Sequence, residues 1–106
     1  MNFPNQIYLG RKKAYIQQVP NRLAVDIVLD CDVTGALVRI PMTVKQLEQF
    51  LSPNRPLMQN LFPEMTSEVR EMLISGTTPA EWQQMFGESA FTKEQLVKFG
   101  YEFDNE

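Results

Sequence analysis

Residues 23–46 read LAVDIVLDCDVTGALVRIPMTVKQ, and the hydrophobic period of the chain changes inside this stretch. Up to Met42, apolar side chains recur at every second position, which is typical of strands that bury one face. Between the two alternating runs, the segment DVTG at residues 32–35 has Asp at its first position and Gly at its fourth, as many turns do. From Thr43 onward the spacing becomes helical. The stretch therefore predicts a β-hairpin followed at once by a helix.

The residues before this hairpin have the composition of further strands. Residues 13–19 read KAYIQQV, and residues 6–10 read QIYLG. We therefore expect an antiparallel meander of three or four strands over about residues 5–42. Pro41 has no N–H to donate, so the second strand of the hairpin is expected to end there or to lie at an edge of the sheet.

The second half of the chain carries three copies of one helix-starting pattern: TVKQ at 43–46, TPAE at 78–81 and TKEQ at 92–95. In each, the threonine hydroxyl can accept the third helical N–H, while Gln or Glu reaches back to the threonine N–H. Glycines follow at the expected helix ends, because glycine tolerates the left-handed conformation there. The predicted helices span 44–51, 67–75, 79–86 and 93–99, with one short helical turn around 57–61.

Together these patterns predict an α+β fold. A chain of 106 residues has the usual size of one domain with one core, so residues 1–106 are expected to form a single unit. The β-rich part covers about 5–42, and a packed cluster of about four short helices covers 43–100. Residues 101–106 are expected to be either an added edge strand or a linear binding motif.

This chain has few residues that are suited to catalysis or metal binding. Histidine is absent, which removes the commonest general base and the commonest metal ligand. Cys31 falls on the apolar face of a predicted strand, so we interpret it as a small core residue rather than a nucleophile. Asp26, Asp30 and Asp32 are interpreted as the solvated face and turn of the hairpin rather than a metal cluster. We predict a non-enzymatic protein that needs no metal or other cofactor.

The location of the protein is also suggested by composition. No apolar run approaches the roughly 20 residues that cross a bilayer, so no membrane association is expected. The N-terminal charge at GRKK follows a short apolar stretch, the reverse of a secretory signal. A single cysteine fits a reducing compartment, and we expect a cytoplasmic protein.

Residues 70–87, REMLISGTTPAEWQQMFG, raise the question of a helix-turn-helix. A DNA-reading helix needs basic or amide side chains toward the bases and phosphates. The second helix here has Gln83 and Gln84 but no Lys or Arg. Its apolar residues Trp82, Met85 and Phe86 form a stripe at helical spacing, which we expect to pack into the core. The two helices are therefore interpreted as supporting the fold rather than binding DNA. Structural roles are assigned to Gly76, Thr78, Glu81 and Trp82.

Nucleic-acid binding through residues 66–87 is kept as the alternative function. Nucleic-acid binders usually present a clear basic face, because phosphate contacts supply most of their affinity. Residues 1–53 have a charge balance of +2, whereas residues 54–106 have a balance of −5. The candidate phosphate contacts in this alternative are Arg11, Lys12, Lys13 and Arg70.

Residues 62–87, FPEMTSEVREMLISGTTPAEWQQMFG, resemble a family of small uncharacterised proteins that bacteriophages and prophages encode. The shared elements are Phe-Pro, Arg-Glu, Ser-Gly, Thr-Pro-x-Glu-Trp and a closing Phe, here Phe62, Pro63, Arg70, Glu71, Ser75, Gly76, Thr78, Pro79, Glu81, Trp82 and Phe86. The resemblance covers residues 42–87. It implies a phage or mobile-element context, and hence a bacterial host cell, but no activity.

The expected function is binding of another protein, with inhibition of a host or defence factor as its consequence. An acidic half of the molecule can steer encounter with a positively charged partner. The alternative is that the same glutamates only keep the outer sides of the helices soluble, which the modest net charge of −3 favours. The aromatic side chains of the tail can anchor such a partner. The candidate partner-binding residues are Tyr101, Phe103, Glu88, Glu94, Glu102 and Asp104. The identity of the partner, and whether the chain self-associates, are left open.

Overall fold

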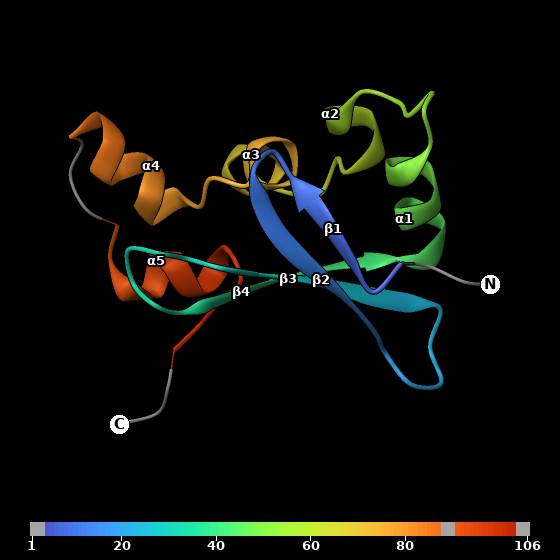
Figure 1. Ribbon diagram of the computed structural model, residues 1–106, viewed down its shortest axis with the longest axis horizontal. Coiled ribbons are helices and arrows are strands. Elements are labelled where there is room, and N and C mark those ends of the chain that lie inside the picture. Colours follow the sequence, from blue (N-terminus) through green and yellow to red (C-terminus); the bar gives the residue numbers. More distant parts are fainter. Residues whose placement is uncertain (1–3, 88–90, 104–106) are drawn as a thin grey trace.

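The structure, a computed structural model, describes residues 4–87 and 91–103. Its fold is α+β, as the sequence predicts: an N-terminal antiparallel meander is followed by a series of short helices (Figure 1). The helices α4 and α5 lie near one end of the long axis, and α1 and α2 lie near the other (Figure 1).

The described residues form one antiparallel sheet with the order β1-β2-β3-β4-β5. Its strands are β1 (Gln6–Leu9), β2 (Lys12–Gln18), β3 (Ala24–Asp30), β4 (Leu37–Thr43) and β5 (Tyr101–Glu102). The predicted meander of three or four strands is confirmed with four, and of the two alternatives for the tail its start forms the added edge strand. Pro41 lies inside β4 opposite Asp26, but β5 pairs only with Leu37 and Val38. Around Pro41, β4 therefore lies at the edge of the sheet, where a missing N–H is tolerated.

The helices start and stop close to the predicted positions. They are α1 (Val44–Leu51), α2 (Met58–Leu61), α3 (Ser67–Ser75), α4 (Pro79–Phe86) and α5 (Lys93–Lys98). Capping boxes begin α1, α4 and α5. Thr66, which no capping box marks in the sequence, caps α3 by accepting the Val69 N–H. Gly76 and Gly87 end α3 and α4 in the left-handed conformation, with φ of 77° and 68°.

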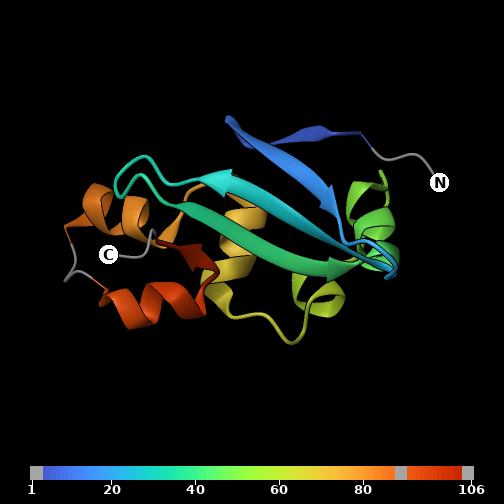
Figure 2. The same ribbon diagram turned by 90° about the horizontal axis from the view of Figure 1, so that it is seen from below.

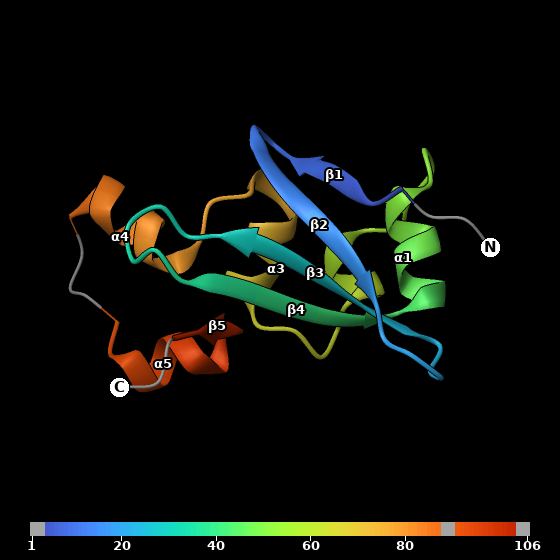
Figure 3. The same ribbon diagram turned by 60° about the horizontal axis from the view of Figure 1, so that its bottom comes forward.

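The core lies between one face of the sheet and the helices. Val25, Ile27 and Leu29 of β3 are buried there, with Leu47 and Leu73 from the helices. Figure 3 shows α3 behind the middle of the sheet, and Figure 2 shows the strands on one side of the molecule and most of the helices on the other. Burial of this apolar face is the main stabilising contribution to the fold.

The other face of the sheet is polar and aromatic. Tyr8 and Tyr15 are exposed on it. Arg39 forms ion pairs with Asp26 at 3.2 Å and with Glu102 at 2.9 Å. Exposed pairs of this kind contribute little to stability but hold neighbouring strands in register. Within the described residues, no helix is long and apolar enough to cross a membrane.

Candidate functional site

The predicted partner-binding residues of the tail do not share one free surface. Tyr101 is only 3% exposed and belongs to β5, so its predicted place on a binding surface is wrong. Phe103 is partly buried and stacks on the Tyr101 ring, with centroids 5.8 Å apart. Glu94 and Glu102 are exposed, and Glu102 pairs with Arg39. Two further candidates, Glu88 and Asp104, lie outside the described residues.

Helix α4 presents its apolar side chains outward. Trp82 is 40% exposed, Met85 67% and Phe86 57%. The prediction that this stripe packs into the core is therefore wrong. We call these three residues the α4 apolar face. The Trp82 and Phe86 rings lie against each other with centroids 4.5 Å apart.

The side of α4 that faces the core carries polar groups beside Pro79 and Ala80. Thr78 is fully buried at its start, and Gln83 is nearly so. The Thr78 hydroxyl donates to the Cys31 thiol at 3.1 Å, and the Tyr101 hydroxyl donates to the same sulfur at 3.4 Å. The Tyr101 hydroxyl in turn accepts the Ala80 N–H at 3.1 Å. Because a buried polar group must find a partner, this cluster orients α4 with these polar groups inward.

Replacement of Trp82 by alanine is expected to cost no more than about 1.5 kcal/mol of unfolding free energy, because the main interaction lost is a partly exposed ring pair. Denaturant unfolding of the two proteins checks this. Phe62→Ala is the control, since Phe62 is fully buried and its loss is expected to cost about 3–5 kcal/mol. A similar loss of unfolding free energy in both variants would contradict an exposed position for Trp82.

Cys31 is fully buried, as its predicted strand register requires. Burial acts to raise the pKa of its thiol, but hydrogen bonds with Thr34, Thr78 and Tyr101 outweigh burial and leave the pKa below its ordinary value. Burial also raises the pKa of the Tyr101 hydroxyl. The thiol therefore ionises more readily than an ordinary cysteine, in a place that a soluble reagent does not reach.

Modification of Cys31 by a soluble disulfide reagent is expected to be slow in the native protein and fast after denaturation, because access rather than thiolate content limits the rate. The absorbance of the released thiol follows the reaction. Val25→Ala, a change in the core away from the cysteine, supplies the comparison for general destabilisation. Immediate stoichiometric reaction of the native protein would contradict the buried position.

A second polar cluster joins α4 to the start of β2 and the end of β3. The Lys12 ammonium forms an ion pair with the Glu81 carboxylate and donates to the Asp30 carbonyl at 2.8 Å. The same carboxylate accepts the Thr78 N–H at 3.0 Å and the Asp32 N–H at 2.7 Å. Glu81 therefore caps its own helix and fixes it to the sheet, which is the structural role predicted for it.

This cluster bears on the nucleic-acid alternative. Lys12 is neutralised by Glu81, and the groove that it shares with Arg11 and Lys13 is also lined by Asp30 and Asp32. Arg70, the fourth predicted phosphate contact, does not line that groove; its guanidinium lies 3.5 Å from the Phe62 carbonyl. The four predicted contacts therefore do not make the basic face that phosphate binding favours.

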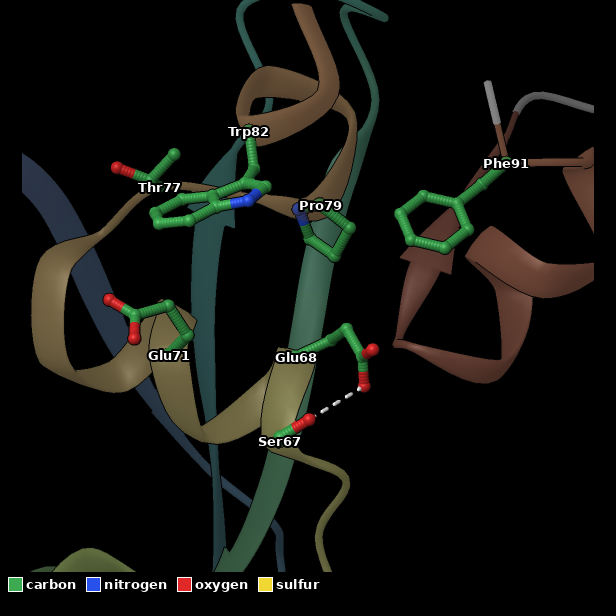
Figure 4. Close-up of a pocket in the computed structure, with 7 residues that line it drawn as sticks. All are labelled: Ser67, Glu68, Glu71, Thr77, Pro79, Trp82 and Phe91. Atoms are coloured by element: carbon green, nitrogen blue, oxygen red, sulfur yellow. Dashed lines mark hydrogen bonds between the residues drawn. The ribbon is translucent and has the colours of Figure 1, made fainter. Parts of the chain in front are cut away.

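A pocket of about 260 Å³ opens between α3 and α4 (Figure 4). Its walls combine the rings of Pro79, Trp82 and Phe91 with the carboxylates of Glu68 and Glu71 and the hydroxyls of Ser67 and Thr77. In Figure 4 the Trp82 indole lies above the Glu71 side chain, and Glu68 reaches toward the Phe91 side. Sequence reasoning missed this pocket. The available signal was the spacing of Glu68 and Glu71, three positions apart on one helix, before a tryptophan beyond the glycine stop.

Among the described residues, no three His, Cys, Asp or Glu side chains gather closely enough to hold a metal ion. Comparisons with protein families, with curated proteins and with solved structures find no match to the chain.

Proposed function

We propose that the chain is a non-enzymatic accessory protein of a phage or mobile element, which acts in the host cytoplasm by binding another protein. Inhibition of a host or defence factor is the proposed consequence. The observation that carries this proposal is the α4 apolar face, where Trp82, Met85 and Phe86 are all exposed. Aromatic residues and methionine are enriched at protein interfaces, and tryptophan is enriched among the residues that dominate binding energy.

The α4 apolar face is hard to explain by stability alone. A sequence selected only for folding would place charged or polar residues on the outer side of a short surface helix. Here the outer side carries two aromatic rings in contact and a methionine, while a threonine and a glutamine face inward. Exposed apolar groups that cluster rather than scatter are typical of interaction sites.

The proposed phage context rests on the resemblance of residues 62–87. These residues include the whole of α3 and α4, and hence the α4 apolar face. Trp82 and Phe86 are among the residues that carry the resemblance. The segment that supports the context is therefore also the segment that supports the binding function.

The experiment is site-specific photo-crosslinking. A photoreactive phenylalanine analogue is placed at Met85 in one protein and at Leu57 in a control protein; the two side chains are 67% and 66% exposed, and Leu57 lies beside α2. Both proteins are irradiated in bacterial lysate, and adducts are identified by mass spectrometry. We expect a discrete adduct from position 85 that position 57 does not form and that Phe86→Ala suppresses. Identical adduct patterns from both positions would overturn the proposal.

A further inference from the structure

We propose that the pocket between α3 and α4 receives an arginine side chain of the partner protein; this inference rests on the proposed binding function and names the chemistry that the partner must present. The pocket borders the α4 apolar face, because Trp82 belongs to both. A partner that covers α4 would therefore also close the pocket.

The walls of the pocket suit a flat, partly apolar cation. The Trp82 indole, the Phe91 ring and the Pro79 ring provide apolar surface. An indole is the best aromatic partner for a cation within about 6 Å of its face. The same rings can cover the methylene stem of a long side chain while its charged end reaches further in.

The pocket carries two carboxylates and, among the described residues, no cation to balance them. Glu68 and Glu71 both line it, and neither forms an ion pair within the described part of the chain. The polar contact of Glu68 is a 3.3 Å hydrogen bond from the neighbouring Ser67 hydroxyl. No lysine or arginine of the described residues lines the pocket. A cation supplied from outside would therefore neutralise two carboxylates that the described residues leave without an ion-pair partner.

Size and geometry favour a single guanidinium. Sites for drug-sized molecules occupy about 300–1,000 Å³, whereas this pocket measures about 260 Å³, so one side chain fits better than a whole small ligand. A guanidinium is planar, stacks on aromatic faces and binds carboxylates through two parallel hydrogen bonds. A lysine ammonium is more strongly hydrated and lacks the flat surface that stacks on an indole.

The test uses the single tryptophan of the chain as its reporter, because any change in tryptophan fluorescence then reports on Trp82. Three peptides of the form acetyl-Gly-Xaa-Gly-amide, with arginine, citrulline or lysine at the centre, are titrated into the full chain. We expect saturable quenching by the arginine peptide, with affinity about tenfold above that of the uncharged citrulline peptide. Equal responses to arginine and citrulline, or to arginine and lysine, would overturn the proposal.

A matched pair of variants separates the pocket from general charge. Glu68→Gln with Glu71→Gln removes both carboxylates from the pocket, and Glu48→Gln with Glu64→Gln removes the same charge from exposed positions on α1 and between α2 and α3. We expect the first pair to lose the arginine response by about tenfold and the second to keep it. Equal loss in both would overturn the assignment to the pocket.

The same variants distinguish this inference from the proposed function. If the photoreactive group at Met85 captures a partner equally well in the chain with Glu68→Gln and Glu71→Gln, the binding function stands and the arginine pocket fails. If capture is lost together with the arginine response, both stand. Absence of any adduct specific to position 85, with the arginine response intact, would overturn the binding function and leave the pocket as a cation site.

Discussion

Replacing Glu81 with alanine is expected to destabilise the protein by about 3–5 kcal/mol, the loss typical of removing one partner from a buried ion pair. Lys12 and Glu81 are both mostly buried. Without the carboxylate, the Lys12 ammonium and the backbone N–H groups of Thr78 and Asp32 lose an acceptor at once. Urea unfolding of the wild type and the variant measures the difference.

Glutamine at position 81 separates the two roles of this side chain. Two other capping boxes of the chain use glutamine, at Gln46 and Gln95, so Glu81→Gln is expected to keep the cap of α4 and lose only the charge opposite Lys12. We expect a loss of about 1–3 kcal/mol, smaller than that of alanine. Glu48→Gln, on the exposed side of α1, is the control and should change stability by less than about 0.5 kcal/mol. Equal losses for alanine and glutamine would assign the whole effect to charge.

The contribution of Glu81 also depends on pH. Burial acts to raise its pKa, but hydrogen bonds from Lys12 and from the Thr78 and Asp32 amides outweigh burial and hold the pKa below its ordinary value of 4.5. A group with a lowered folded-state pKa stabilises the fold fully above its unfolded pKa, and that stabilisation is lost as the pH falls through the folded pKa. The stability difference between wild type and Glu81→Gln should therefore shrink below pH 4.5. A difference that stays constant on acidification would contradict this account.

Alanine at Gly76 is expected to cost about 2–5 kcal/mol. The left-handed backbone, with φ of 77°, costs a residue with a side chain about 1–2 kcal/mol. An added Cβ would also lie 2.1 Å from the Leu9 carbonyl oxygen. Because that atom belongs to the backbone of the β1–β2 hairpin, the clash is relieved only if hairpin and helix separate, an overpacking cost of about 1–3 kcal/mol.

Gly87 is a matched control for this prediction. It ends α4 in the same left-handed conformation, with φ of 68°, but nothing lies within 4 Å of its added Cβ. Gly87→Ala should therefore carry only the conformational cost of about 1–2 kcal/mol. Thermal and urea unfolding of both variants isolates the steric part. Equal losses at the two positions would mean that α3 and the hairpin do not pack closely at Gly76.

Local patterns were enough to predict most of the fold. The period of two in residues 23–42 and the threonine caps at Thr43, Thr78 and Thr92 are effects of neighbouring residues, so the sequence displays them directly. The direction in which α4 faces is different. Periodicity shows that Trp82 and Phe86 share a side of the helix, but the side that is buried depends on what lies beneath it.

The side of α4 that is buried depends on contacts between residues that are far apart in the sequence. Thr78 faces inward because Cys31 lies 47 positions earlier and Tyr101 accepts the neighbouring Ala80 N–H. Lys12 meets Glu81 across 69 positions. Neither pair has a signature in the sequence, because each partner sits in an ordinary strand or helix start. The candidate pocket was missed for the same reason, since its walls come from α3, α4 and Phe91 together.

The short pairing of β5 with β4 has a kinetic consequence. The strands of the meander are neighbours along the chain, whereas Arg39 and Glu102, which join β4 to β5, are 63 positions apart. Closing so long a loop costs more entropy than closing a hairpin, so we expect β5 to add last during folding and to detach first in native fluctuations. Each detachment withdraws the Tyr101 hydroxyl from both Ala80 and Cys31. If Cys31 reacts only when β5 has detached, its reaction rate in the native protein measures how often this strand opens. The same rate then gives the time for which α4 stays in place between openings.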